Sequence, residues 1–281
     1  IRKPASPGME NRKGVILQGH VDMVPQKNSS KNHDFEKDPI DAWIDGDWVK
    51  AKDTTLGADN GIGVAAAMSI LESKDIKHGP VEALFTADEE TGMTGANGLK
   101  AGILKGDILI NMDSEDEGEL YVGCAGGVDT NAKFNFTSVE VPPNMSPYKV
   151  SVMGLKGGHS GLDIHLGRGN ANKIMNDILK KAYEKFGVRL SSIDGGSLRN
   201  AIPRESFAVV VVPDKNKDEF KKFIQDYENN AKKEFQDVDP GLLIKVDSTK
   251  MPTSLIDEET QNNLYKAVGE CVNGVTAMSK D

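Results

Sequence analysis

The sequence predicts two domains: an α/β domain with a mainly parallel sheet flanked by helices over residues 1–126, and an α+β domain over residues 127–281. In the first part of the chain, short apolar runs alternate with a helix-forming segment, the pattern of strand–helix–strand units. Glycines cluster in "GCAGGVDT" (123–130), a composition that suits a domain boundary. A length of 281 residues is enough for two domains.

Three apolar runs in the first domain predict buried strands at residues 14–20, 81–87 and 107–113. Residues 61–73, "GIGVAAAMSILES", are rich in Ala, Met and Leu and predict a helix directly after the "LGADN" turn. Each predicted strand ends at or just before a potential metal ligand: His20, the pair Glu89 and Glu90, and Asp113. Because sites in open α/β sheets lie at the carboxyl ends of the strands, we expect these side chains to meet along one edge.

The second domain shows a different order of elements. Residues 148–157 and 206–213 predict strands, and residues 167–186, 216–235 and 257–272 predict helices. This sequence of elements favours an α+β domain without repeats or low-complexity segments.

The acids and the histidine of the first domain form a candidate metal site, although each motif alone has an ordinary explanation. In "HVD", His20 can bind a metal through one ring nitrogen while Asp22 takes the proton on the other nitrogen. "LGADNG" (56–61) is also a common turn composition, and "DEET" (88–91) is also typical of a solvated loop. Taken in order along the chain, the motifs predict four mixed nitrogen and oxygen ligands: His20, Asp59, Glu90 and Asp113.

This ligand set suits zinc, with manganese or cobalt as alternatives. A carboxylate such as Asp59 can bridge two ions, and one of the two neighbouring glutamates can act as a base toward water.

The composition excludes other functions. The net charge of −9 argues against a nucleic-acid partner, which requires a basic surface. No apolar run is long enough for a membrane span. We therefore expect a cytoplasmic protein.

Motifs spread over the chain point to a known family: "GHVDMV" (19–24), "DTTLGADNGIGVA" (53–65), "TADEETGMTGA" (86–96), "INMDSEDEGELYVGCAGG" (110–127), "KGGHSGLDIHLGRGNA" (156–171) and "LRNAIPRE" (198–205). Through these motifs the whole chain resembles the co-catalytic zinc exopeptidases related to aminoacylase and glutamate carboxypeptidase. Within them it resembles the aminoacyl-histidine dipeptidases, also called cytosolic nonspecific dipeptidases.

The resemblance implies a role for each site residue. His20, Asp59, Glu90 and Asp113 would hold two zinc ions, with Asp59 as the bridge and a cis peptide bond after it. Glu89 would be the general base, and Asp22 would orient His20. In the second domain, which matches the family's lid and dimerisation domain, His159 would polarise the scissile carbonyl and Asn200 would contact the substrate backbone. The implied reaction is hydrolysis of dipeptides, Xaa-His and broader, by a water that two zinc ions activate, in a homodimer formed through the lid.

One departure from the family pattern concerns the second metal. The family has a further His ligand after the lid, whereas this chain has no histidine beyond His165. We therefore expect the chain to be a fragment with an incomplete lid and an incomplete second metal site.

Three alternatives remain open at this stage. The chain could belong to a tripeptidase, to an N-acyl amino acid deacylase of the same family, or to a non-catalytic relative that binds metal or peptide. The presence of Glu89, a base with no purpose in an inactive relative, argues against the last of these.

Overall fold

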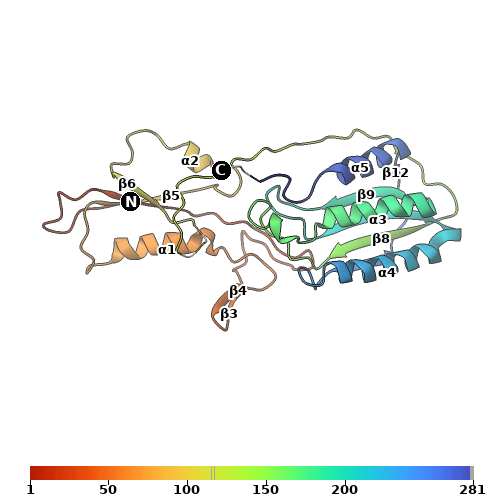
Figure 1. Cartoon of the computed structure of the whole chain (residues 1–281), viewed down its shortest axis with the longest axis horizontal. Coiled ribbons are helices and arrows are strands. Elements are labelled where there is room, and N and C mark those ends of the chain that lie inside the picture. Colours follow the sequence, from red (N-terminus) through yellow and green to blue (C-terminus); the bar gives the residue numbers. More distant parts are fainter. Residues whose placement is uncertain (115, 117, 279–281) are drawn as a thin grey trace. The chain divides into compact units, whose positions relative to one another are not determined.

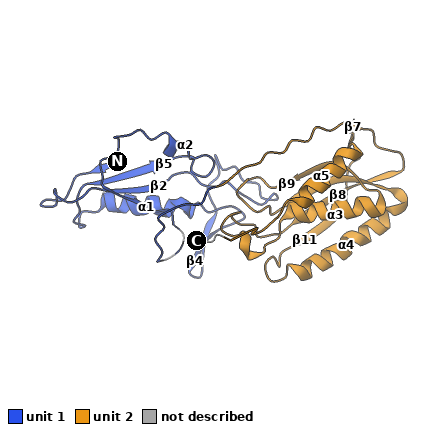
Figure 2. Ribbon diagram, turned by 45° about the horizontal axis from the view of Figure 1, so that its top comes forward, with its two compact units in different colours: residues 1–126 blue, residues 127–281 orange. Residues whose placement is uncertain are grey.

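The computed structural model describes residues 1–114, 116 and 118–278. The chain forms two compact units, residues 1–126 and residues 127–281, which Figure 2 shows in different colours. Glu115 and Glu117 of the acidic stretch that follows Asp113 lie outside the described residues. Among the described residues, no helix is both long and apolar enough to cross a membrane.

The first unit is built on a four-stranded sheet with the strand order β1-β5-β2-β6. Strand β2 (Val15–His20) lies in the middle and pairs in parallel with β5 (Val81–Thr86) and β6 (Ile108–Asn111). The short strand β1 (Arg2–Lys3) pairs antiparallel with β5. The predicted α/β fold with a mainly parallel sheet is thereby confirmed, and the carboxyl ends of three parallel strands lie along one edge.

Helix α1 (Ala58–Glu72) packs on β2 and β5. Ala67 of the helix lies in a small core with Leu17, Val81 and Ala83 of the two strands. Gly57 precedes the helix with φ 80°, and a Cβ at this position would lie 2.8 Å from the sulfur of Met23. A glycine is therefore required where the chain turns into the helix.

Strand β6 differs from its prediction as a buried strand. Ile108, Leu109 and Ile110 are 43%, 53% and 47% exposed. The physical reason is that β6 lies at the edge of the sheet while helix α1 packs on β2 and β5.

Three short elements complete the first unit. Strands β3 (Ala42–Asp45) and β4 (Trp48–Ala51) form a hairpin, and α2 (Thr94–Asn97) is a single helical turn. None of the three was predicted, because each is too short to show a periodic pattern.

The second unit contains an antiparallel sheet with the order β11-β8-β10-β9. Its strands are β8 (Met145–Met153), β9 (Arg189–Gly195), β10 (Ser206–Pro213) and β11 (Leu243–Ser248). Helices α3 (Ala171–Phe186) and α4 (Lys217–Glu234) pack on the sheet, and α5 (Glu258–Glu270) packs on α3 (Figure 1). Strands β7 (Ser138–Val139) and β12 (Leu255–Ile256) form a separate pair.

Alternation along β8 explains why helices cover one face of this sheet. Tyr148, Val150 and Val152 are fully buried and share one core with Phe220 and Ile224 of α4. The predicted α+β architecture is confirmed, with β9 and β11 as strands that the sequence did not predict.

Candidate metal centre

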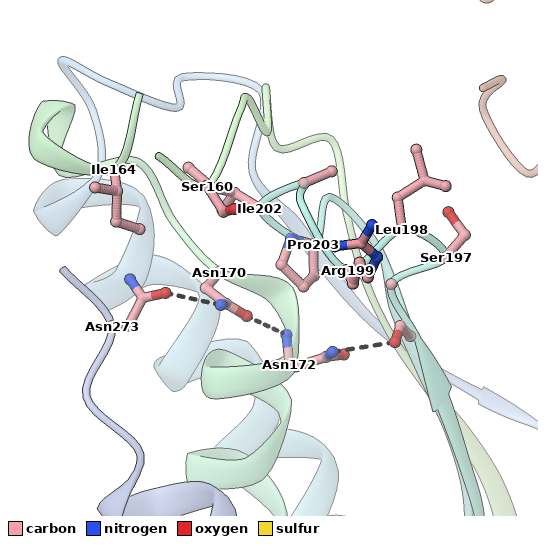
Figure 3. Close-up of a pocket in the computed structure, with 13 residues that line it drawn as sticks. Ser160, Ile164, Asn170, Asn172, Ser197, Leu198, Arg199, Ile202, Pro203 and Asn273 are labelled. Atoms are coloured by element: carbon pink, nitrogen blue, oxygen red, sulfur yellow. Dashed lines mark hydrogen bonds between the residues drawn. The ribbon is translucent and has the colours of Figure 1, made fainter. Parts of the chain in front are cut away.

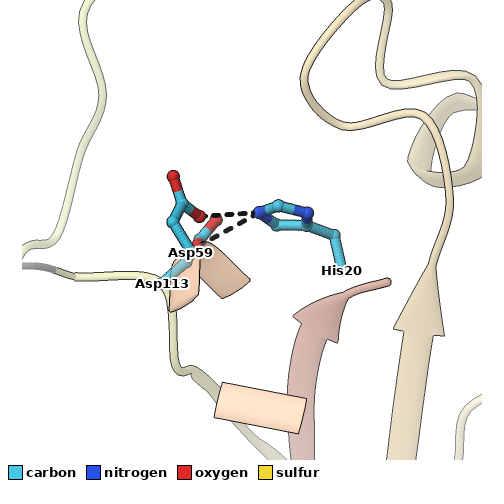
Figure 4. Close-up of side chains that lie close together, drawn as sticks. All are labelled: His20, Asp59 and Asp113. Carbon is cyan, nitrogen blue, oxygen red and sulfur yellow. Dashed lines mark hydrogen bonds and ion pairs between the residues drawn. The ribbon is translucent and has the colours of Figure 1, made fainter. Parts of the chain in front are cut away.

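Three ligand-type side chains from separate segments converge at the carboxyl edge of the first sheet (Figure 4). His20 is the last residue of β2, Asp59 lies at the start of α1, and Asp113 follows β6. Nε2 of His20 lies 3.0 Å from Oδ1 of Asp59 and 3.5 Å from Oδ1 of Asp113. The arrangement follows from the parallel sheet, which brings the ends of β2 and β6 to one edge.

The other ring nitrogen of His20 fixes the orientation of the imidazole. Nδ1 lies 2.9 Å from the main-chain carbonyl oxygen of Asp22, which can only accept a hydrogen bond. Nδ1 therefore carries a proton and donates it, while the carboxylate of Asp22 lies farther away, at 3.5 Å. The orienting contact expected from the Asp22 side chain is thus made mainly by its carbonyl group.

The carboxylate of Asp22 holds the next loop instead. Its two oxygens accept hydrogen bonds from the backbone N–H groups of Glu89 (3.1 Å) and Glu90 (3.2 Å). These two glutamates follow β5, and ligand atoms of both lie within 4.8 Å of His20 and of each other. The structure therefore brings together all six residues predicted for the first domain: His20, Asp22, Asp59, Glu89, Glu90 and Asp113.

Asn60 is a site residue that sequence reasoning missed. Its side chain is 4% exposed, and its Nδ2 donates to the carbonyl of Met112 at 2.8 Å and to Oδ1 of Asp113 at 2.5 Å. The peptide bond between Asp59 and Asn60 is cis. The available signal was an amide residue next to the central Asp of a glycine-rich turn, which also suits an ordinary turn.

Burial, together with the crowding of negative charge, shifts the pKa values of the carboxylates in the cluster. Burial and the charges of Asp59 and Glu89 raise the pKa of Glu90 to about 7. Burial, with the charges of the neighbouring acids, also raises the pKa of Glu89 and of Asp113.

His20 and Asp22 shift toward their charged forms. Burial alone would lower the pKa of His20, but its hydrogen bond to Asp59 and the charges of Asp113 and Asp59 raise it above the usual value. For Asp22, burial is outweighed by the backbone N–H groups of Glu89 and Glu90, which lower the pKa of its carboxyl group.

The cluster fits a metal cation. Among the described residues, the ion pairs of Asp22, Asp59 and Asp113 are all made with His20, so a single imidazole stands against several carboxylates. Burying carboxylates without a matching positive charge raises the free energy of the folded state, and a divalent cation supplies that charge. One imidazole nitrogen with carboxylate oxygens is a donor set that zinc, manganese and cobalt accept.

His159 and Asn200, the predicted substrate-binding residues, belong to the second unit. The main chain of the His159 segment pairs with the segment of Asn200, since Ser160 N donates to Asn200 O at 2.7 Å and His159 forms a bridge with Ala201. Nδ1 of His159 accepts hydrogen bonds from the N–H groups of Gly161 (3.0 Å) and Leu162 (3.1 Å). An accepting Nδ1 carries no proton, so the neutral ring has its proton on Nε2 and presents that N–H as a donor.

A cavity of about 420 Å³ lies beside this pair of segments (Figure 3). Ser160 and Arg199 line it, together with the amide side chains of Asn170, Asn172 and Asn273. Asn170 caps α3 by accepting from Asn172 N, and it donates to Asn273 at 2.8 Å. Ile164, Leu198 and Ile202 also line the cavity, so its walls are both polar and apolar, and two of its amide side chains are already bonded to each other.

Comparison with known proteins defines the class of the second unit first. Residues 150–239 match the family model described as a peptidase dimerisation domain. This range covers most of the sheet and both helices that pack on it.

Two relatives then match nearly the whole chain. The chain is 47% identical, over 98% of its length, to the cytosol non-specific dipeptidase of Escherichia coli (strain K12). It is also similar to the crystal structure of an aminoacylhistidine dipeptidase from Vibrio alginolyticus, with 48% identity over 99% of the chain and a TM-score of 0.59. An uncharacterized protein of Bacillus subtilis (strain 168), YqjE, is 23% identical over 80% of the chain.

The chain is thus similar to these dipeptidases over nearly its whole length. It covers 57% of the Escherichia coli protein and 57% of the Vibrio alginolyticus chain, so it spans little more than half the length of its relatives.

Proposed function

We propose that the intact protein is a metal-dependent dipeptidase that acts on Xaa-His dipeptides and other dipeptides. The observation that carries this proposal is the convergence of His20, Asp59, Glu89, Glu90 and Asp113 at the carboxyl edge of a parallel sheet. The names of the two relatives, a non-specific dipeptidase and an aminoacylhistidine dipeptidase, support the substrate class.

Four side chains would hold the metal: His20, Asp59, Glu90 and Asp113, with Asp59 between two zinc ions. When bound, zinc would act as a Lewis acid toward the scissile carbonyl and would lower the pKa of water. Nδ1 of His20 is occupied by the carbonyl of Asp22, so Nε2, which faces Asp59 and Asp113, is the nitrogen that would bind the metal.

Glu89 would be the general base of the reaction. Its backbone N–H is held by Asp22, and its carboxylate lies among the ligand atoms of His20 and Glu90. From this position it would take a proton from the attacking water and pass it to the leaving amine. Asp22 would act as the residue that orients both His20 and the Glu89–Glu90 loop.

His159 and Asn200 would bind the substrate from the second unit. The donor N–H on Nε2 of His159 suits the negative oxygen that develops on the carbonyl as water attacks. Asn200 would contact the substrate backbone, beside the cavity of Figure 3.

The arrangement of domains follows from these roles. Residues 1–126 would be the N-terminal part of the catalytic domain, and residues 127–281 the lid, through which the protein would form a homodimer; the matched dimerisation domain supports this. The word "cytosol" in the name of the Escherichia coli relative supports a cytoplasmic location.

A substrate panel tests the proposal. We expect the zinc-loaded, full-length gene product to hydrolyse Xaa-His and other dipeptides, and a chelator to abolish the activity. Tripeptides and N-acyl amino acids serve as the comparison substrates. Hydrolysis of tripeptides or N-acyl amino acids in place of dipeptides would support the proposed metal-dependent reaction but contradict the proposed substrate class. Binding of zinc without hydrolysis of any substrate would contradict the proposal that the protein is an enzyme.

A further inference from the structure

Asp239, which follows α4, is a buried acid that neither the motifs nor the metal centre explains. It is 1% exposed, and among the described residues no Lys, Arg or His lies within ion-pair distance of it. An ionised carboxylate in such a position requires strong hydrogen bonds in compensation. Its bonding partners therefore indicate what the carboxylate holds in place.

The two partners are the ends of one loop. Oδ1 accepts from the backbone N–H of Lys156 at 2.6 Å, and Oδ2 accepts from the backbone N–H of Gly169 at 2.6 Å. Between these two residues runs the segment that carries His159. Hydrogen bonds to a charged acceptor are short and about twice as strong as neutral ones, so Asp239 joins both ends of the loop firmly to the end of α4.

A chain of contacts leads from the ends of this loop to the imidazole. Arg168 donates to the carbonyl of Gly157 at 2.6 Å and lies 3.4 Å from Oδ2 of Asp163. The same Oδ2 accepts from the N–H of His159 at 2.9 Å, and the N–H of Asp163 donates to the carbonyl of His159 at 2.9 Å. This turn also contains Gly161 and Leu162, whose N–H groups bind Nδ1 of His159.

We propose that Asp239 is a positioning residue for His159. By joining Lys156 to Gly169, it closes the loop in the one arrangement that keeps Nδ1 of His159 as an acceptor and Nε2 as the donor. The inference rests on the proposed function for the effect on catalysis, whereas the effect on the tautomer of His159 is independent of it.

The test compares Asp239→Asn with a matched control, Asp257→Asn. Asp257 lies in the same unit and also accepts one backbone N–H on each oxygen, from Thr260 at 2.9 Å and from Thr137 at 2.8 Å. Among the described residues, neither of these partners belongs to the His159 loop. Both variants lose the same kind of interaction, so a general loss of stability affects both.

Two readouts separate positioning from stability. In the 281-residue chain, ¹⁵N NMR of the His159 ring shows a single Nε2–H tautomer for the wild type and for Asp257→Asn, and we expect a mixture of tautomers for Asp239→Asn. In the full-length gene product we expect Asp239→Asn to lower kcat by between about 10- and 100-fold with KM within about threefold of wild type, since a displacement on the scale of 1 Å has effects of that order.

Two further variants make the outcome decisive. If Asp239→Asn does not fold, Asp163→Asn breaks the same chain of contacts within the partly exposed loop, and the same tautomer mixture is expected. An unchanged tautomer and unchanged kcat in a folded Asp239→Asn or Asp163→Asn protein would overturn the inference. His159→Ala separates the positioning of His159 from its proposed part in catalysis. If this variant leaves kcat unchanged, the proposed role of His159 in catalysis fails. A tautomer mixture in Asp239→Asn would still support Asp239 as the residue that positions the ring.

Discussion

At the scale of single residues, the metal centre depends on atoms other than the ligand atoms themselves. A carbonyl group selects the tautomer of His20, and the carboxylate of Asp22 fixes the backbone of the loop that carries both glutamates. Asn60 donates to the same oxygen of Asp113 that faces His20. Such supporting contacts keep the ligands in position before a metal binds, which reduces the cost of ordering them.

The first prediction separates the two glutamates. Glu89→Gln should lower kcat by at least about 10²-fold because the amide cannot take a proton, while zinc content stays at the wild-type level. Glu90→Gln should instead lower zinc affinity. Kinetics and metal analysis of the two variants check this, and loss of zinc in Glu89→Gln with zinc retained in Glu90→Gln would exchange the two roles.

The second prediction concerns Asp22. Asp22→Asn should weaken zinc binding by about 10- to 100-fold, because the amide replaces one of the two oxygens that hold the Glu89–Glu90 loop. Isothermal titration with zinc measures the effect. Asp34→Asn, which changes a partly exposed acid bonded to Lys37, is the control and should bind zinc as the wild type does. Equal affinity for both variants would contradict the role of Asp22.

At the scale of elements, buried or capping carboxylates join segments that are distant in sequence. Glu82 of β5 accepts from Arg2 of β1 at 2.8 Å and from the N–H groups of Lys105 and Gly106 ahead of β6. One carboxylate thereby joins the edge strand β1, the inner strand β5 and the start of β6. It lies at the other end of β5 from the glutamates of the metal centre.

The third prediction follows from the titration of Glu82. Its hydrogen bonds with Arg2 and the backbone lower its pKa from 4.5 to about 2. The pKa of Glu82 is lower in the folded state than in the unfolded state. The stabilisation that its hydrogen bonds give to the folded protein is therefore fully present above pH 4.5 and disappears as the pH falls toward 2.

Glu82→Gln should therefore lower the free energy of unfolding by about 1–3 kcal/mol at pH 7, and by progressively less between pH 4.5 and pH 2. Denaturant unfolding at a series of pH values measures this difference. Glu72→Gln, a change at the exposed end of α1, is the control. A difference between wild type and Glu82→Gln that does not vary with pH would contradict the prediction.

The fourth prediction concerns the start of α5. Asp257 caps the helix through Thr260 N and also binds Thr137 N, which precedes β7. Asp257→Ala should lower the free energy of unfolding by about 1 kcal/mol, within the usual range for loss of an N-cap. Chemical denaturation tests this, and Asp257→Ser, which retains a capping oxygen, should recover part of the loss.

At the scale of the whole molecule, each unit has its own hydrophobic core. The core of the second unit contains only residues between Tyr148 and Tyr265, and that of the first unit is a smaller set around Leu17 and Ala67. The boundary falls between Gly126 and Gly127. A unit whose apolar residues are buried among themselves can fold without the rest of the chain.

The fifth prediction is that residues 127–281 fold alone. We expect a single cooperative thermal transition by circular dichroism, with the helix content of α3, α4 and α5. Phe220, which is fully buried between Tyr148 and Phe186, provides the control. Phe220→Ala should lower the free energy of unfolding of this unit by about 3–5 kcal/mol. An unfolded or non-cooperative fragment would show that the unit depends on the rest of the molecule.

The sequence by itself determined the strands that end at ligands. His20 ends the apolar run of β2, and Glu89–Glu90 closely follow the apolar run of β5, so both patterns are local in the sequence. Because the carboxyl ends of parallel strands lie at one edge of a sheet, these patterns predict a shared site. The second unit was determined in the same way, because its long helices and the apolar strands β8 and β10 show clear periodicity.

Only the tertiary structure decided which atoms support the site. The contact of Asn60 with Asp113 and the closing of the His159 loop by Asp239 join residues far apart in the chain. The orientation of His20 by the carbonyl rather than the carboxylate of Asp22 depends on the backbone conformation after β2, which the apolar pattern does not record. The exposure of β6 depends on its place at the sheet edge. Periodicity records which face of an element is apolar, but hydrogen-bond partners and strand order arise only when the segments are brought together.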